Sequence, residues 1–61
     1  LGSYTVAPSY SETVVGIYNT DYSALGTDSF NEADRLFVVG NGTDDSNRSD
    51  AMVVLKNGNM G

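Results

Sequence analysis

Short runs of apolar, β-branched residues separated by polar turn residues are the main pattern along this chain. The runs cover 13–16, 37–40 and 52–55, and asparagine follows each of them within a few residues. Runs this short and this rich in valine are typical of β-strands, whereas an amphipathic helix needs a longer segment with a 3.6-residue period. Glycine, asparagine, serine and threonine interrupt the chain repeatedly. The sequence therefore predicts an all-β fold.

The second and third runs predict a β-hairpin. We expect strands at about 35–40 and 50–56, with a polar loop between them and a turn at Asn57-Gly58 after the second strand. The connection is longer than the two-residue turn that an Asn-Gly pair alone favours, so Asn41-Gly42 is expected to begin a broader loop. The recurrence of the three runs fits either the stacked coils of a solenoid or repeated strands of one sheet. The first interval between runs is longer than the second, so no strict repeat is established and both remain open.

The two hairpin strands are apolar at consecutive positions, which sets them apart from strands with one wet face. Successive strand residues point to opposite faces of a sheet, so both faces need burial. A chain of 61 residues buries only ~60% of the surface that it exposes when unfolded. We therefore predict an obligate oligomer whose core is shared between copies. The predicted core residues are Val14, Leu36, Phe37, Val38, Val39, Met52, Val53, Val54 and Leu55.

Composition narrows what can stabilise so small a chain and what it can bind. Cysteine and histidine are both absent, which excludes disulfides and the usual zinc sites and leaves association as the remaining means of stabilisation. Eight acidic residues against three basic ones give a net charge of −5, which argues against nucleic acid as a partner. No apolar run approaches the length of a membrane span, so this segment is not expected to insert into a membrane.

The chain is expected to form a single segment, 1–61, with three parts of different texture. Residues 1–20 contain small residues and tyrosines that suit closely stacked coils, and 35–59 form the hairpin. Residues 21–34 are mostly polar and are expected to be an irregular connection. Within them, Ser29 and Glu32 have the spacing of a helix capping box, which predicts one helical turn held in place by Phe30.

Three segments resemble known fibre proteins. Residues 34–43, beginning Asp34-Arg35-Leu36-Phe37-Val38-Val39, and 48–59, containing Arg48-Ser49-Asp50 and Lys56-Asn57-Gly58, resemble tail-fibre-domain proteins of Bacteroidetes and their phages. Residues 10–20 also resemble the head repeats of trimeric autotransporter adhesins, which carry a Ser-x-Ala-x-Gly pattern. Here Thr13 stands where alanine is usual, and Gly16 falls one residue late.

The resemblance implies a trimeric β-roll or β-prism in which three chains share one core. It implies a structural or adhesive segment of an extracellular homotrimeric fibre, on a bacterial surface or in the tail fibre of a phage or injection particle. Such a segment displays or forms a tip that attaches to a host or surface. Its partners would be two further copies of the chain and, at the tip, a cell-surface glycan or protein receptor.

Enzymatic activity is not expected, because the chain lacks histidine and cysteine and has no nucleophile motif. Carboxylates are its only acid–base candidates, and acids in turns more often cap backbone donors. Asp45, Asn47 and Ser49 alternate as oxygen donors, as in part of a calcium loop, but the central glycine and distal glutamate of an EF-hand are missing. We expect no metal or other cofactor.

An alternative function is a glycan- or receptor-binding module that uses loop 42–49 or the tyrosines. Aromatic rings offer flat apolar faces with a polar tip, which suits both ligand stacking and packing between coils. The candidate binding residues are Tyr10, Tyr18, Asp44, Asp45, Asn47 and Arg48. Sequence proximity further predicts ion pairs of Arg35 with Asp34 and of Arg48 with Asp50.

Overall fold

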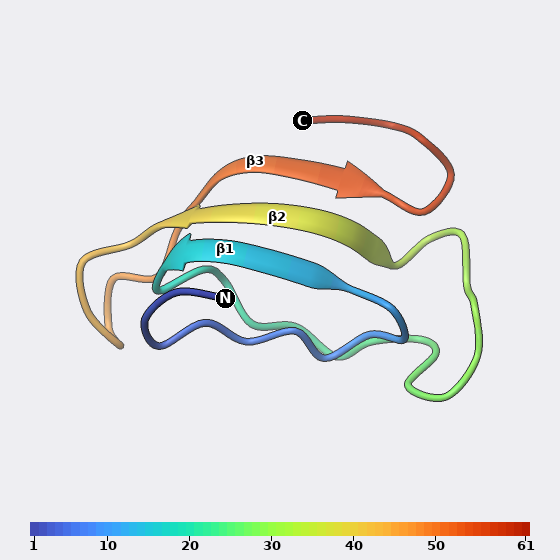
Figure 1. Cartoon of the computed structure of the whole chain (residues 1–61), viewed down its shortest axis with the longest axis horizontal. Coiled ribbons are helices and arrows are strands. Elements are labelled where there is room, and N and C mark those ends of the chain that lie inside the picture. The colour runs from blue at the N-terminus through green and yellow to red at the C-terminus, as the bar shows by residue number, and fades with distance from the viewer.

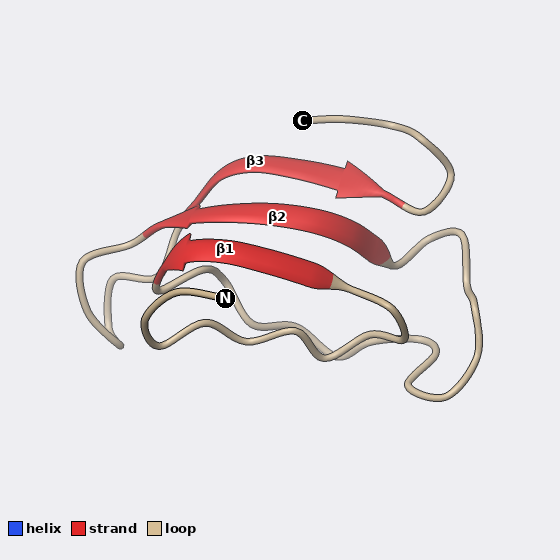
Figure 2. Cartoon of the chain, viewed as in Figure 1, coloured by secondary structure: helices blue, strands red, loops and turns tan.

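The computed structural model describes all residues, 1–61, and contains three strands and no helix (Figures 1 and 2). The strands are β1 (Thr13–Ile17), β2 (Arg35–Asn41) and β3 (Asp50–Leu55). They form one mixed sheet in the order β1-β2-β3, with β1 parallel to β2 and β3 antiparallel to it. The predicted all-β class and the predicted hairpin of β2 and β3 are confirmed.

The first part of the chain forms parallel tiers beside β2. β1 pairs with β2 in a register that places Gly16 beside Gly40. The N-terminal residues run parallel to β1 in turn, with Ser3 opposite Ile17. Figure 1 shows this segment, in dark blue, along the lower side of β1. The three runs are therefore strands of one sheet, which is the second of the two readings that the sequence left open.

The C-terminal residues fold back along the outer edge of β3. Asn57 and Gly58 form the turn that the sequence predicts, and Gly58 has a φ of 92°. Gly61 and Val53 then exchange two backbone hydrogen bonds, of 2.8 and 2.9 Å. In Figure 1 this segment lies above β3. Short segments therefore line both edges of the three-stranded sheet.

Apolar burial inside the chain is small. The accessible surface of 3682 Å² is close to the ~3800 Å² that scaling gives for a folded monomer of this mass, so the chain is as compact as an ordinary small domain. Nevertheless, Val14 and Val38 are its only fully buried large apolar side chains. The other buried side chains of any size are polar or charged, namely those of Ser9, Asn19, Asp34, Arg35 and Lys56.

The helical turn predicted at 29–32 is wrong. No helix forms between β1 and β2, and Phe30, which was expected to hold the turn in place, is 60% exposed. Asn31 instead forms a turn with Ala33 and Asp34, whose N–H groups donate to its side-chain and backbone oxygens respectively. With no apolar surface to cover at this position, the capping pair has no helix to begin.

Candidate oligomerisation surface

One face of the sheet carries a continuous set of apolar side chains that no segment of the chain covers. Strand alternation and register place Thr13, Phe37 and Val54 in one row across this face, and Val15, Val39 and Met52 in the next. We call it the outer face, and its apolar residues are Val15, Phe37, Val39, Met52 and Val54. All five are only partly buried.

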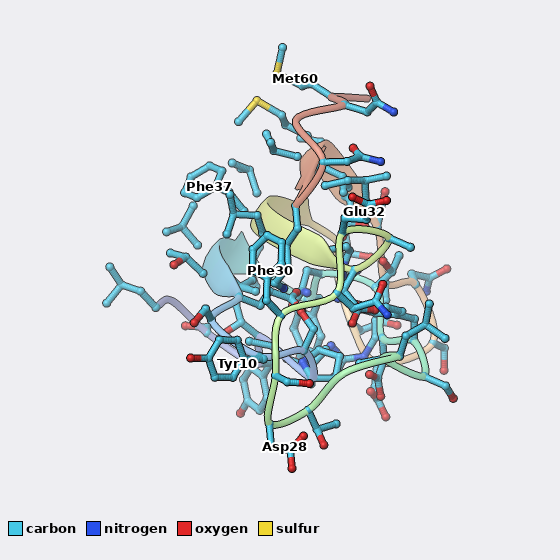
Figure 3. All side chains as sticks on the ribbon, turned by 90° about the vertical axis from the view of Figure 1, so that its right-hand side faces the viewer. Tyr10, Asp28, Phe30, Glu32, Phe37 and Met60 are labelled. Carbon is cyan, nitrogen blue, oxygen red and sulfur yellow. The ribbon has the colours of Figure 1, made fainter.

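Figure 3 shows the asymmetry of the two faces. Phe37 projects on one side of the sheet, and the loop that carries Glu32 lies on the other. Val14 and Val38, on this second or inner face, are 3% and 0% exposed. Both faces are apolar along β1 and β2, yet the loops of the chain bury only one of them. The outer face is therefore an apolar surface, already partly buried, that a partner could cover further.

The inner face is held by a buried ionic network centred on Arg35. The guanidinium lies 3.0 Å from Glu12 Oε2 and 3.5 Å from Asp50 Oδ2, and its Nη1 donates to Thr20 Oγ1 at 2.8 Å. It also stacks over the ring of Tyr22, 4.2 Å from the centroid. Arg35 begins β2 and Asp50 pairs with Gly40 near its other end, so the side chain extends along the inner face.

This network binds the loops to the sheet but contributes little hydrophobic stabilisation. Removing a charged group from water costs several kcal/mol per ion, and about 20 kcal/mol in the idealised limit. The attraction between the charges offsets this cost only when their geometry is good. Arg35 Nε is buried without a hydrogen-bond acceptor, so the geometry is incomplete. A polar core of this kind determines the positions of the loops more than it contributes to the free energy of folding. Further stabilisation of the chain then depends on burial of apolar surface elsewhere.

Asp34 and Lys56 complete the inner layer. The Asp34 carboxylate accepts hydrogen bonds from the N–H groups of Leu25 and Gly26, at 2.9 and 2.8 Å. The pKa of Asp34 is lower than its ordinary 3.8, chiefly because the carboxylate accepts the hydrogen bond from the Leu25 N–H. Burial acts in the opposite direction and raises this pKa. The Gly26 N–H, the Tyr22 hydroxyl and the charge of Lys56 lower it further. Lys56 Nζ donates to the Arg35 carbonyl at 2.7 Å and to Ser9 Oγ at 3.0 Å.

The residues predicted to form a shared core divide between the two faces. Phe37, Val39, Met52 and Val54 lie on the outer face, where a second chain could reach them. The others divide as follows: Val14, Val38 and Val53 point to the inner face, Leu36 lies at a register shift between Arg35 and Phe37, and Leu55 is opposite Arg35. Val53 and Leu55 line an apolar hollow of about 300 Å³ with Asn59, Met60 and Gly61.

Three of the six predicted binding residues meet at one end of the sheet. Arg48 lies over the Tyr18 ring, 5.3 Å from its centroid, and forms an ion pair with Asp45 at 2.9 Å. Tyr18 also stacks in parallel on Tyr4, with ring centroids 4.8 Å apart. Arg48 further donates to the Tyr4 and Asn19 carbonyls.

The remaining three predicted binding residues lie apart from this stack. Asn47 donates to both carboxylate oxygens of Asp44 within the exposed loop, which closes the loop on itself. Tyr10 precedes β1, whereas Tyr18 follows it, so the two tyrosines lie toward opposite ends of that strand. The Tyr10 N–H donates to the Gly26 carbonyl, and its side chain is 43% exposed.

Both ion pairs expected from sequence proximity are wrong. Arg35 pairs with Glu12 and Asp50, while its neighbour Asp34 turns away to cap backbone N–H groups. Arg48 pairs with Asp45, earlier in the same loop. Asp34 precedes β2, and its carboxylate accepts hydrogen bonds from the N–H groups of Leu25 and Gly26 instead of pairing with the neighbouring guanidinium.

Sequence reasoning missed the Arg35 network because its members come from segments that are far apart along the chain. One signal was present. Arg35 begins the most apolar strand, and Asp50 and Lys56 flank the next one. Charged residues at the ends of strands that are otherwise apolar can mark positions where the sheet meets a polar layer.

The fold defines this chain as a small all-β protein with a three-stranded mixed sheet. No protein-family model, curated protein or solved structure matches it. The resemblance to fibre proteins therefore stays a prediction. None of the molecule's segments is a helix long and apolar enough to span a membrane, and no three acidic side chains converge as metal ligands.

Proposed function

We propose that this chain is a structural segment of an extracellular homotrimeric fibre, in which the outer faces of three copies form one core. The segment displays or forms a tip that attaches to a host or surface. The observation that carries the proposal is the outer face itself, a sheet surface of five apolar side chains in a molecule with only two fully buried ones. Threefold symmetry and the extracellular setting come from the resemblance.

Shared burial is the mechanism. Burying a fully exposed aliphatic or aromatic side chain is worth ~1.5–3 kcal/mol, so a side chain that is already partly buried gains a fraction of this on assembly. The contributions of five such residues per copy add up, so assembly and folding support each other. The exposed acidic residues of segments 21–34 and 42–49 stay in solvent and oppose lateral aggregation of assembled copies.

A charge on the outer face tests this proposal. Val39→Asp is expected to abolish assembly, because the carboxylate would be desolvated between copies. Leu25→Asp is the matched control, since Leu25 is a 70% exposed aliphatic residue in the loop between β1 and β2. Sedimentation velocity should show an oligomer for the parent chain and for Leu25→Asp, and a smaller or unfolded species for Val39→Asp. Equal behaviour of the two variants would contradict the proposal.

A binding module is the second candidate, favoured by the cluster of Tyr18, Arg48 and Asp45 at one end of the sheet. Its ligand would be a surface glycan or a receptor loop that contacts the exposed loop 42–49. The test is binding to immobilised glycans or to cells after Asp45→Ala, with the oligomeric state measured in parallel. Loss of binding with unchanged assembly supports this function, and unchanged binding rejects it for this loop.

A further inference from the structure

Residues 1–4 form an exposed sheet edge with the same backbone conformation as residues 15–18, the segment along which they lie. Gly2 and Gly16 both have positive φ, 123° and 96°, and so do Tyr4 and Tyr18, at 55° and 45°. Both pairs have the same separation along the chain as Ser3 and Ile17, which lie opposite each other. Two tiers of the chain therefore share one backbone conformation.

The hydrogen bonds between tiers follow the same repeat. The Ser3 N–H donates to the Gly16 carbonyl, and the Tyr18 N–H donates to the Ser3 carbonyl. One tier further on, the Gly42 N–H donates to the Ile17 carbonyl in the same way. The equivalent groups on the first tier are the Gly2 carbonyl and the Tyr4 N–H, and neither takes part in any hydrogen bond of the molecule.

The glycines explain why tiers can approach so closely. A Cβ at Gly2 would lie 2.0 Å from the Gly16 carbonyl oxygen, and a Cβ at Gly16 would lie 2.3 Å from that of Gly40. A glycine is therefore needed at both positions, because the backbone of the neighbouring segment leaves no space for a side chain. The Tyr4 and Tyr18 rings, 4.8 Å apart, keep the spacing of neighbouring strands. Tyr4 is 70% exposed, so one more ring can stack on it.

We propose that the edge at residues 1–4 is a docking surface for one more parallel coil that repeats the pattern of residues 1–14. Its strand would place a glycine beside Gly2 and an aromatic ring over Tyr4. The residue of the added coil that lies opposite Ser3 would donate its N–H to the Gly2 carbonyl, and its carbonyl would accept a hydrogen bond from the Tyr4 N–H. The occupant is specified by the repeat, since the tier of residues 1–4 already docks in this way on the tier of 15–18. This inference does not depend on the trimer, because it concerns stacking within one chain.

An added coil tests the inference. A copy of residues 1–14 is fused ahead of Leu1, which keeps the offset at which Ser3 lies opposite Ile17. Because each coil of a solenoid adds an interface with its neighbour, the Tm should rise by about 5 °C or more. Amide exchange at Tyr4, followed by NMR, should slow at least about tenfold.

The matched control is the same fusion with valine in place of the copied glycine, whose side chain would collide with the Gly2 carbonyl. It should lose both effects, even though it adds the same length and nearly the same composition. Unchanged Tm and Tyr4 exchange in the glycine-bearing fusion would overturn the proposal, and so would equal gains from both fusions. Concentration-dependent protection of Tyr4 in the parent chain would overturn it as well, by showing that a second copy occupies the edge.

The outcome is distinguishable from that of the proposed function. Sedimentation of Val39→Asp reports on the outer face, whereas Tyr4 exchange reports on the sheet edge. Either result can fail while the other holds.

Discussion

Arg35 shows most clearly how single residues organise this chain. Its guanidinium contacts Glu12 before β1, Thr20 after it and Asp50 at the start of β3. One side chain therefore ties the two segments that flank β1 to the β2–β3 hairpin. Glu12 and Arg35 are 0% and 8% exposed at their side chains, so water screens their interaction little.

Removing Arg35 should be more costly than removing Arg48, whose side chain is 22% exposed and whose ion-pair partner lies in solvent. Arg35→Met leaves Glu12 and Asp50 without their cation, and breaking a buried ion network in this way costs about 3–5 kcal/mol. Arg48→Met removes an ion pair with Asp45, which is 86% exposed, and two hydrogen bonds to backbone carbonyls, but it leaves no buried charge unpaired, so the cost should be about 1–2 kcal/mol. Urea unfolding of both variants measures the difference, and equal losses would contradict the assigned role of the network.

Asp34 gives the fold an acid sensitivity. Its pKa is lowered in the folded state, chiefly by the Leu25 N–H, so its stabilising effect is present above the unfolded pKa of 3.8 and is lost as the pH falls through the folded pKa. Asp34→Asn should be less stable than the parent at pH 7, and the gap should close below about pH 4. Unfolding curves recorded from pH 7 to pH 2 provide the measurement. A gap that persists at low pH would argue against this carboxylate as the cause.

At the scale of the elements, the strands could be read from the sequence and their partners could not. Valine-rich runs bounded by asparagine and glycine located β2 and β3 and the turn after them, because strand propensity and turn chemistry are local properties. The parallel pairing of β1 with β2 depends on how the long connection 18–34 returns, and on Gly16 meeting Gly40. Nothing local to either segment specifies that meeting.

Two glycines separate the effect of stacking from that of backbone strain. Gly16 and Gly58 have nearly equal φ, 96° and 92°, but a Cβ at Gly16 would lie 2.3 Å from the Gly40 carbonyl oxygen, whereas nothing lies within 4 Å at Gly58. Gly58→Ala should cost about 1 kcal/mol, the penalty of a left-handed backbone. Gly16→Ala should cost about 1–3 kcal/mol more, because the tiers must move apart. Thermal unfolding of both variants checks this, and similar losses would refute close stacking at Gly16.

For the candidate surface, the need for burial could be predicted from the sequence, but the face that stays open could not. Unbroken apolar runs indicated that both faces of the hairpin need burial, and the structure leaves one of these faces open. Which side stays open was not predictable, because it depends on where loops 5–12 and 18–34 lie. Alternation gives Val38 and Val39 opposite faces, but only the fold identifies Val39 as the one available to a partner.

At the scale of the whole molecule, the chain has an ordinary surface area and an unusual interior. Charged and polar side chains occupy most of the inner layer, and five partly buried apolar side chains lie together on the outer face. Contiguous apolar surface that stays accessible on a small protein can mark a site of association. A shared core accounts for both features, since the inner network positions the loops while the outer face supplies apolar burial on assembly.

The mass of the native particle tests this account most directly. Sedimentation equilibrium of the unmodified chain at micromolar concentration should give three times the 6.5 kDa of one chain, together with a cooperative unfolding transition whose midpoint rises with concentration. A stably folded particle of 6.5 kDa, with a concentration-independent midpoint, would contradict the shared core.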